Sequence, residues 1–107
     1  MNEAAFIKMV DDGKIDEAVA VYDDAAKKYP GWKIFSEDAA NQAGYRFLHK
    51  GDNANAIKVF QLNVRAYPDS WNVYDSLGEG FLKAGDKKNA MINYKKSLEI
   101  DPQLKAA

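Results

Sequence analysis

Apolar side chains recur along most of the chain with the spacing of an amphipathic helix. Ahead of Gly85 they fall at intervals of three and four residues, which places them on one helical face. This stripe consists of Tyr74, Leu77, Gly78, Phe81 and Leu82, and a second stripe follows at Ala90, Tyr94, Ser97 and Leu98. Because glycine readily adopts the left-handed conformation that ends a helix, Gly85 separates two predicted helices. Asp86 is the expected N-cap of the second.

The same pair of predicted helices occurs more than once. Residues 37–70 laid over residues 71–104 give eight identical pairs without a gap, including Gly51 with Gly85 and Pro68 with Pro102. The second unit repeats the two stripes, at Ala40, Ala43, Gly44, Phe47 and Leu48, then at Ala56, Phe60, Asn63 and Val64. The first unit begins within its first helix, with Ala5, Phe6, Met9 and Val10 directed inward. Fixed-period repetition of this kind indicates a stacked helical repeat.

The chain is therefore predicted to be a single all-α domain over residues 1–107, with about six helices. The predicted units are a truncated repeat one at 2–30, repeat two at 37–70 and repeat three at 71–104. Residues 31–36 form an inserted turn, since the spacing from Pro30 to Pro68 exceeds the later spacing by four residues. Four residues make about one helical turn. The helix of repeat two could thus start one turn early.

Two aromatic residues of the inserted turn are expected to pack over the first unit. These are Trp32 and Phe35. An exposed Trp32 would instead indicate a site for a partner.

The motif spacing resembles the tetratricopeptide repeat, a helix–turn–helix unit of 34 residues. Repeat three carries its signature at Tyr74, Leu77, Gly78, Phe81, Ala90, Tyr94 and Pro102, and repeat two at Gly44, Phe47, Ala56, Phe60 and Pro68. Asn63, Arg46 and Gly80 depart from that pattern. The resemblance implies a right-handed superhelical stack of helical hairpins. It also implies a concave groove, lined by the first helix of each unit, that binds a peptide or a partner protein.

Carrying the groove positions over residue by residue gives a set of candidate binding residues. They are Asn41, Tyr45, His49, Asn72, Asp75 and Glu79. Family members that bind a terminal carboxylate use a clamp of basic and amide residues, whereas this groove carries Asp38, Asp75 and Glu79. A neutral or basic peptide is therefore the expected ligand.

Composition argues against several other functions. A net charge of −1 and a pI near 5.8 disfavour nucleic-acid binding, which normally needs a basic excess. The chain has no cysteine, and no apolar run is long enough to suggest a membrane partner. His49 is the only histidine, and Ser76 and Asp75 sit within a helix without a strained turn or oxyanion loop. We therefore expect no catalytic residue, metal or cofactor.

Charge is distributed unevenly, and this leads to a second hypothesis. Residues 1–26 hold seven acidic and two basic side chains, whereas residues 83–107 hold six basic and three acidic ones. The C-terminal end also lacks an obvious covering helix. Self-association, for instance as a homodimer, could therefore proceed through an apolar patch at this uncapped end. The candidate residues are Met91, Leu98, Ile100 and Leu104.

A narrower resemblance is to repeats at the C-terminal end of some bacterial serine hydrolases. It rests on the strings NQAGY, FQLN, YPDS, NVYDSLGE and NYKKSL, at residues 41–45, 60–63, 67–70, 72–79 and 93–98. This resemblance implies an accessory domain without its catalytic part. The chain as given is expected in the cytoplasm, and in the periplasm or outside the cell if it belongs to such a hydrolase.

Overall fold

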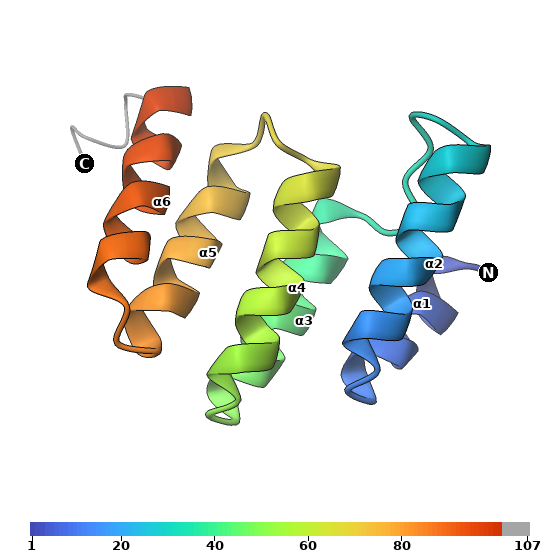
Figure 1. Cartoon of the computed structure of the whole chain (residues 1–107), viewed down its shortest axis with the longest axis horizontal. Coiled ribbons are helices and arrows are strands. Elements are labelled where there is room, and N and C mark those ends of the chain that lie inside the picture. The colour runs from blue at the N-terminus through green and yellow to red at the C-terminus, as the bar shows by residue number, and fades with distance from the viewer. Residues whose placement is uncertain (102–107) are drawn as a thin grey trace.

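The structure, a computed structural model, describes residues 1–101, and that range contains six α-helices and no strand. The helices form three hairpins that lie side by side along the long axis of the molecule (Figure 1). The Cα extents are 40 × 30 × 19 Å. The helices are α1 (Glu3–Asp11), α2 (Ile15–Lys28), α3 (Glu37–His49), α4 (Asn53–Ala66), α5 (Trp71–Lys83) and α6 (Lys87–Ile100). The predicted all-α stack of helical hairpins is confirmed.

The turns inside the second and third hairpins have the same local geometry. Gly51 and Gly85 have φ values of 82° and 85°, in the left-handed region that favours glycine. The aspartate that follows each glycine accepts a hydrogen bond from a backbone N–H of the next helix, at 3.2 Å for Asp52 and 3.1 Å for Asp86. The hydrogen bonds from the Asn89 side chain and backbone hold the pKa of Asp86 below its usual value. The predicted turn chemistry is therefore present.

Two glycines allow the helices of one hairpin to approach closely. A Cβ atom placed on Gly44 would overlap the Phe60 ring, and one placed on Gly78 would lie 2.9 Å from Tyr94. Each glycine therefore leaves space that an aromatic ring of the second helix occupies, and this is the close packing expected of a well-filled core.

The inserted segment does not extend α3 toward the N-terminus, so the alternative of a helix that starts one turn early does not occur. Helix α3 begins at Glu37, and Ser36 caps it by accepting a hydrogen bond from the Ala39 N–H at 3.1 Å. Ile34 and Phe35 are 5% and 2% exposed. Their burial draws the backbone into the core and away from a helical path.

Phe35 joins the first hairpin to the second. Its ring stacks on Phe6 of α1 at 5.2 Å and contacts Tyr22 of α2 at 5.8 Å, centroid to centroid. On the other side, Tyr67, which follows α4, packs edge-on at 6.1 Å and donates its hydroxyl to the Phe35 carbonyl. The prediction that Phe35 packs over the first unit is confirmed. Trp32, in contrast, is 50% exposed and touches the exposed ring of Tyr29.

Three exposed ion pairs also cross the junction between the first two hairpins. They are Arg46–Asp11, Lys58–Asp16 and Arg65–Asp23. Exposed pairs contribute roughly 0–1 kcal/mol each, so the apolar contacts of Phe35 carry more of this junction's stability. Helix α4 packs closely on α5. The corresponding helices of the first junction, α2 and α3, do not pack closely, and the inserted segment lies between the two hairpins instead.

Several stripe residues differ from expectation. Leu82 is 47% exposed and Ala5 is exposed, because no other described element packs over these positions. Asn63, where the family pattern has alanine, is buried, and its amide donates to the Glu37 carbonyl at 3.0 Å. Pro102, the expected end of repeat three, lies outside the described residues.

Replacing Phe35 with alanine should lower the free energy of unfolding by about 3–5 kcal/mol, because the substitution leaves a cavity between three helices. Trp32→Ala is the matched control three residues away, and it should cost less than about 1 kcal/mol since that ring is half exposed. Chemical denaturation monitored by circular dichroism measures both. Equal costs for the two variants would contradict the assignment of Phe35 as the junction.

Candidate functional site

The first helices of the three hairpins, α1, α3 and α5, contact one another in order. Their sequence offsets are 38 residues and then 34, so equivalent positions can be compared directly. Three rows of equivalent residues define what we call the first-helix face. The rows are Glu3, Asn41 and Asp75; Ile7, Tyr45 and Glu79; and Asp11, His49 and Lys83.

The α3–α5 half of the first-helix face is closed by contacts between the predicted residues. The Tyr45 hydroxyl donates to the Glu79 carboxylate at 2.7 Å, and the Ser76 hydroxyl donates to the Asn41 side-chain oxygen at 2.5 Å. The Tyr45 ring also packs edge-on against Phe60 at 5.1 Å between centroids. The structure thus places Asn41, Tyr45 and Glu79 on the same part of the surface. Tyr45 and Glu79 are hydrogen-bonded to each other, and Asn41 is hydrogen-bonded to Ser76.

The remaining predicted residues of this half lie at its edges. His49 is exposed, with its ring 6.1 Å from that of Tyr45. Asn72 and Asp75 are half-buried near the start of α5. Ser76 bonds to Asn41 and not to an imidazole, so no Ser–His pair forms here.

Negative charge collects around Asp75 and Glu79. Burial, followed by the charge of Glu79, raises the pKa of Asp75 above its usual value. Burial also raises the pKa of Tyr45 to about 12, opposed by the Ser76 hydrogen bond and reinforced by Glu79. Tyr94 of α6 has a raised pKa because of burial and, after that, these same carboxylates. Neither Asp75 nor Glu79 forms an ion pair with any residue in the described range, so this region favours a cationic group.

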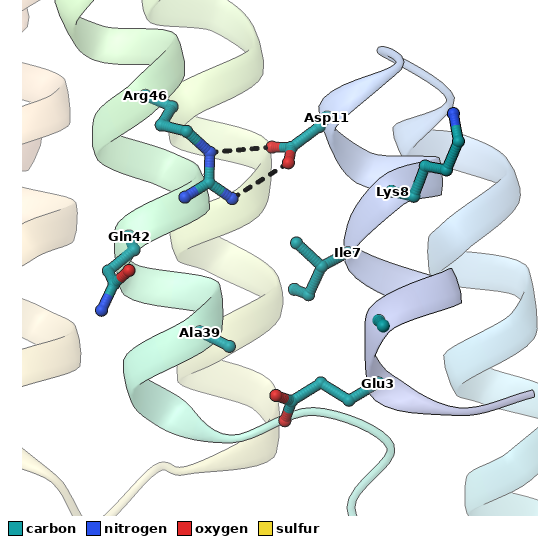
Figure 2. A pocket seen from close by; sticks show the side chains of 8 residues that line it. Glu3, Ile7, Lys8, Asp11, Ala39, Gln42 and Arg46 are labelled. Carbon is teal, nitrogen blue, oxygen red and sulfur yellow. Dashed lines mark hydrogen bonds and ion pairs between the residues drawn. The ribbon is translucent and has the colours of Figure 1, made fainter.

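The α1–α3 half is open. A hollow of about 450 Å³ lies between these two helices (Figure 2). On α3 it is lined by Ala39, Gln42 and Arg46, whereas the equivalent positions of α5 hold Val73, Ser76 and Gly80. The small Ser76 and Gly80 let α5 approach its neighbours closely. The longer Gln42 and Arg46 occupy the corresponding positions in the open half.

Two polar contacts border this hollow, which we call the α1–α3 hollow. The Arg46 guanidinium donates to both carboxylate oxygens of Asp11, at 3.1 and 3.0 Å, and Figure 2 shows this pair at one end. At the other end, Glu3 accepts a hydrogen bond from the Ser36 N–H at 2.8 Å. Between them, Ile7 and Ala39 face each other and provide an apolar floor.

None of the six predicted groove residues lines the α1–α3 hollow, so the sequence reasoning missed this part of the surface. A signal was available, because the 38-residue offset makes Glu3, Ile7 and Asp11, which line the hollow, equivalent to the predicted residues Asn41, Tyr45 and His49. Arg46, noted as a departure from the repeat pattern, proves to be a lining residue.

Other candidate sites are sparse within residues 1–101. That range holds no group of three or more histidine or acidic residues arranged for a metal ion. None of its helices combines the length and apolarity needed to cross a membrane.

Of the residues predicted for self-association, Met91 is 71% exposed, Leu98 and Ile100 are half-buried, and Leu104 lies outside the described range.

Tyr45 should ionise near pH 12 instead of near 10.0. Because its folded pKa is raised, the neutral phenol stabilises the fold below pH 10, and that contribution is lost as the pH rises toward 12. The difference in tyrosinate absorbance between the wild type and Tyr45→Phe isolates this titration. Glu79→Gln should move it part of the way back toward 10.0, whereas Glu99→Gln, an exposed control on α6, should not. Ionisation of Tyr45 near pH 10 in the folded protein would contradict the Tyr45–Glu79 contact.

Comparison with known proteins finds relatives that match about half of this chain. Over 60 residues the chain is 32% identical to human Superkiller complex protein 3, covering 56% of this chain and 4% of that protein. Over 62 residues it is 32% identical to human Anaphase-promoting complex subunit 7, with coverages of 56% and 11%. Over 63 residues it is 33% identical to Cellulose synthase operon protein C of Escherichia coli strain K12, with coverages of 59% and 5%. The chain thus spans only a small part of each of these proteins.

The solved structure of MamA MSR-1 C2 aligns with a TM-score of 0.59 and 20% identity, over 92% of this chain and 54% of that chain. At this identity the likeness shows the fold, a stack of helical hairpins. These relatives give no support to an origin in a bacterial serine hydrolase, which stays a prediction.

Residues 4–31 and residues 72–104 each match the tetratricopeptide repeat family. The chain therefore contains tetratricopeptide repeats in its first and last hairpins.

Proposed function

We propose that this chain is a non-enzymatic protein-interaction scaffold that binds a neutral or basic peptide segment along its first-helix face. The observation that carries the proposal is the α1–α3 hollow, and the carboxylates of Asp75 and Glu79 belong to the α5 part of the same first-helix face. Tetratricopeptide repeats and relatives named as subunits of protein complexes support the general role.

Shape and charge favour an extended peptide over a small molecule. The α1–α3 hollow is shallow, with an apolar floor at Ile7 and Ala39 and polar groups on its borders. An apolar side chain of the peptide would cover the floor. The Gln42 amide nitrogen donates to Asp38 at 2.8 Å, so its side-chain oxygen is the atom that would accept from the peptide backbone.

The charged residues near the site determine which net charge we expect the peptide ligand to carry. Arg46 is already paired with Asp11, so its charge is largely compensated. Asp75 and Glu79 have no cationic partner among residues 1–101, and a lysine or arginine of the peptide would supply one. A protein or peptide of this kind is the proposed partner, in preference to nucleic acid or a membrane.

Peptide binding should be detectable by chemical-shift mapping. The probe is a blocked peptide of alternating lysine and leucine, and a peptide with glutamate in place of lysine tests the charge preference. We expect the lysine peptide to shift the amide signals of α1, α3 and α5, and the glutamate peptide to cause little change.

A pair of matched variants tests the position of the site. Gln42→Lys places a positive charge at the hollow and should weaken binding of the lysine peptide ~10-fold, equivalent to about 1.4 kcal/mol. Gln61→Lys makes the same change at an exposed glutamine of α4 and should leave the affinity close to that of the wild type. Equal effects of the two variants, or shifts confined to the loops, would contradict the proposal.

A further inference from the structure

Two large aromatic side chains are exposed in the connection between α2 and α3 (Figure 1). Tyr29 is 62% exposed and Trp32 is 50% exposed. Their ring centroids lie 6.2 Å apart, with the ring planes at 77°, and the two rings line a hollow of about 380 Å³. We call this pair and its hollow the aromatic corner. An exposed Trp32 was the expected sign of a partner site, so the aromatic corner is the candidate for it.

A tight turn fixes the backbone between the two rings. The Trp32 N–H donates to the Tyr29 carbonyl at 3.0 Å and closes a β-turn with Pro30 and Gly31 at its central positions. Gly31 has a φ of 87°, as a type II turn requires at this place, and proline is favoured at the place before it. Because the turn is formed in the free chain, little backbone ordering is needed when a ligand binds there.

The repeat pattern gives Trp32 no structural role. The 38-residue offset matches Tyr29 with Tyr67 and Trp32 with Ser70, and the same turn recurs there, since the Ser70 N–H donates to the Tyr67 carbonyl at 3.2 Å. Ser70 is the N-cap residue of α5, and the Tyr67 ring packs at the junction between the hairpins. At the first junction Ser36 caps the helix instead. The rings of Tyr29 and Trp32 are therefore left to the solvent.

The chemistry of the aromatic corner matches a proline-rich segment. The Tyr29 hydroxyl and the Trp32 indole N–H donate to no other residue within 1–101. A polyproline II segment carries carbonyl groups without internal hydrogen bonds, and its proline rings dock between aromatic side chains. A planar base instead stacks on a ring face or between parallel rings, and two rings at 77° do not provide the second arrangement.

Positive charge flanks the aromatic corner. Lys27, Lys28 and Lys33 border it in the sequence, and no acidic side chain lies between them. Lys28 pairs with Asp24, whereas Lys27 and Lys33 form no ion pair with any residue that the structure describes. Lys33 lies over the Tyr67 ring at 5.8 Å, but a neutral ring does not cancel its charge. An acidic side chain next to the docked proline is therefore favoured over a basic one.

We propose that the aromatic corner docks a proline-rich peptide segment in the polyproline II conformation, with an acidic residue beside the proline that contacts the two rings. The corner shares no lining residue with the α1–α3 hollow, and it favours a ligand of opposite charge. This inference therefore stands or fails independently of the proposed function of the first-helix face.

Nuclear magnetic resonance titration tests the proposal, because the two tryptophans of the chain give separate indole signals. The probe is the blocked peptide Glu-Pro-Pro-Glu-Pro-Pro-Glu. The Trp32 signal should shift in a saturable way, and the signal of Trp71, a half-exposed residue on α5, should not move. The same peptide with alanine in place of each proline should cause no shift. Lysine in place of each glutamate should weaken binding ~3-fold or more.

Matched variants test the position of the site. Trp32→Ala and Tyr29→Ala should each weaken binding of the proline peptide ~10-fold or more, since each removes one wall of the corner. Trp71→Ala is the control and should bind like the wild type, and so should Gln42→Lys, which alters only the α1–α3 hollow. Circular dichroism establishes that each variant is folded.

Four outcomes would overturn the proposal. The Trp32 signal could fail to shift up to millimolar peptide, or it could shift equally with the alanine peptide. Tighter binding of the lysine peptide would contradict the charge preference. A Trp32 signal that responds to phosphatidylserine vesicles but not to the proline peptide would assign the aromatic corner to a lipid surface.

Discussion

Burial of the Phe35 ring between the first two hairpins is the contact on which the arrangement of this molecule depends. The ring meets α1 through Phe6, α2 through Tyr22 and the end of α4 through Tyr67. Phe35 thus occupies a junction where α2 and α3 do not pack closely together. The exposed ion pairs around it stabilise the junction only weakly. The position of the first hairpin relative to the second therefore follows mainly from an apolar side chain in an irregular segment.

This junction gives the first-helix face two different halves. Between α3 and α5, hydrogen bonds from Tyr45 to Glu79 and from Ser76 to Asn41 close the surface, and Gly80 permits close packing of α5 on α4. Between α1 and α3, Gln42 and Arg46 stand at the equivalent positions, and a hollow remains. Similar repeats therefore produce one half that is closed by hydrogen bonds and one half that is hollowed.

The sequence predicted the features that depend on local chemistry. The repeat period, the turns at Gly51 and Gly85 and the cap at Asp86 all follow from short-range preferences, and the structure contains them. The path of residues 31–36 ahead of α3 was not predictable in this way, because it depends on burial of Ile34 and Phe35 against distant residues. The candidate site was only partly predicted, since Tyr45 and Glu79 were identified but their mutual hydrogen bond depends on how the hairpins stack. To predict the residues of α1 that line the α1–α3 hollow, the offset between the first two units would have had to be applied to α1.

Nuclear Overhauser effects from the Phe35 ring test the central claim most directly. The account predicts cross-peaks from this ring to the rings of Phe6, Tyr22 and Tyr67 in the folded chain. A Phe35 ring that shows none of these cross-peaks and is accessible to a soluble paramagnetic probe would contradict the account, because the first hairpin would then be held by other contacts.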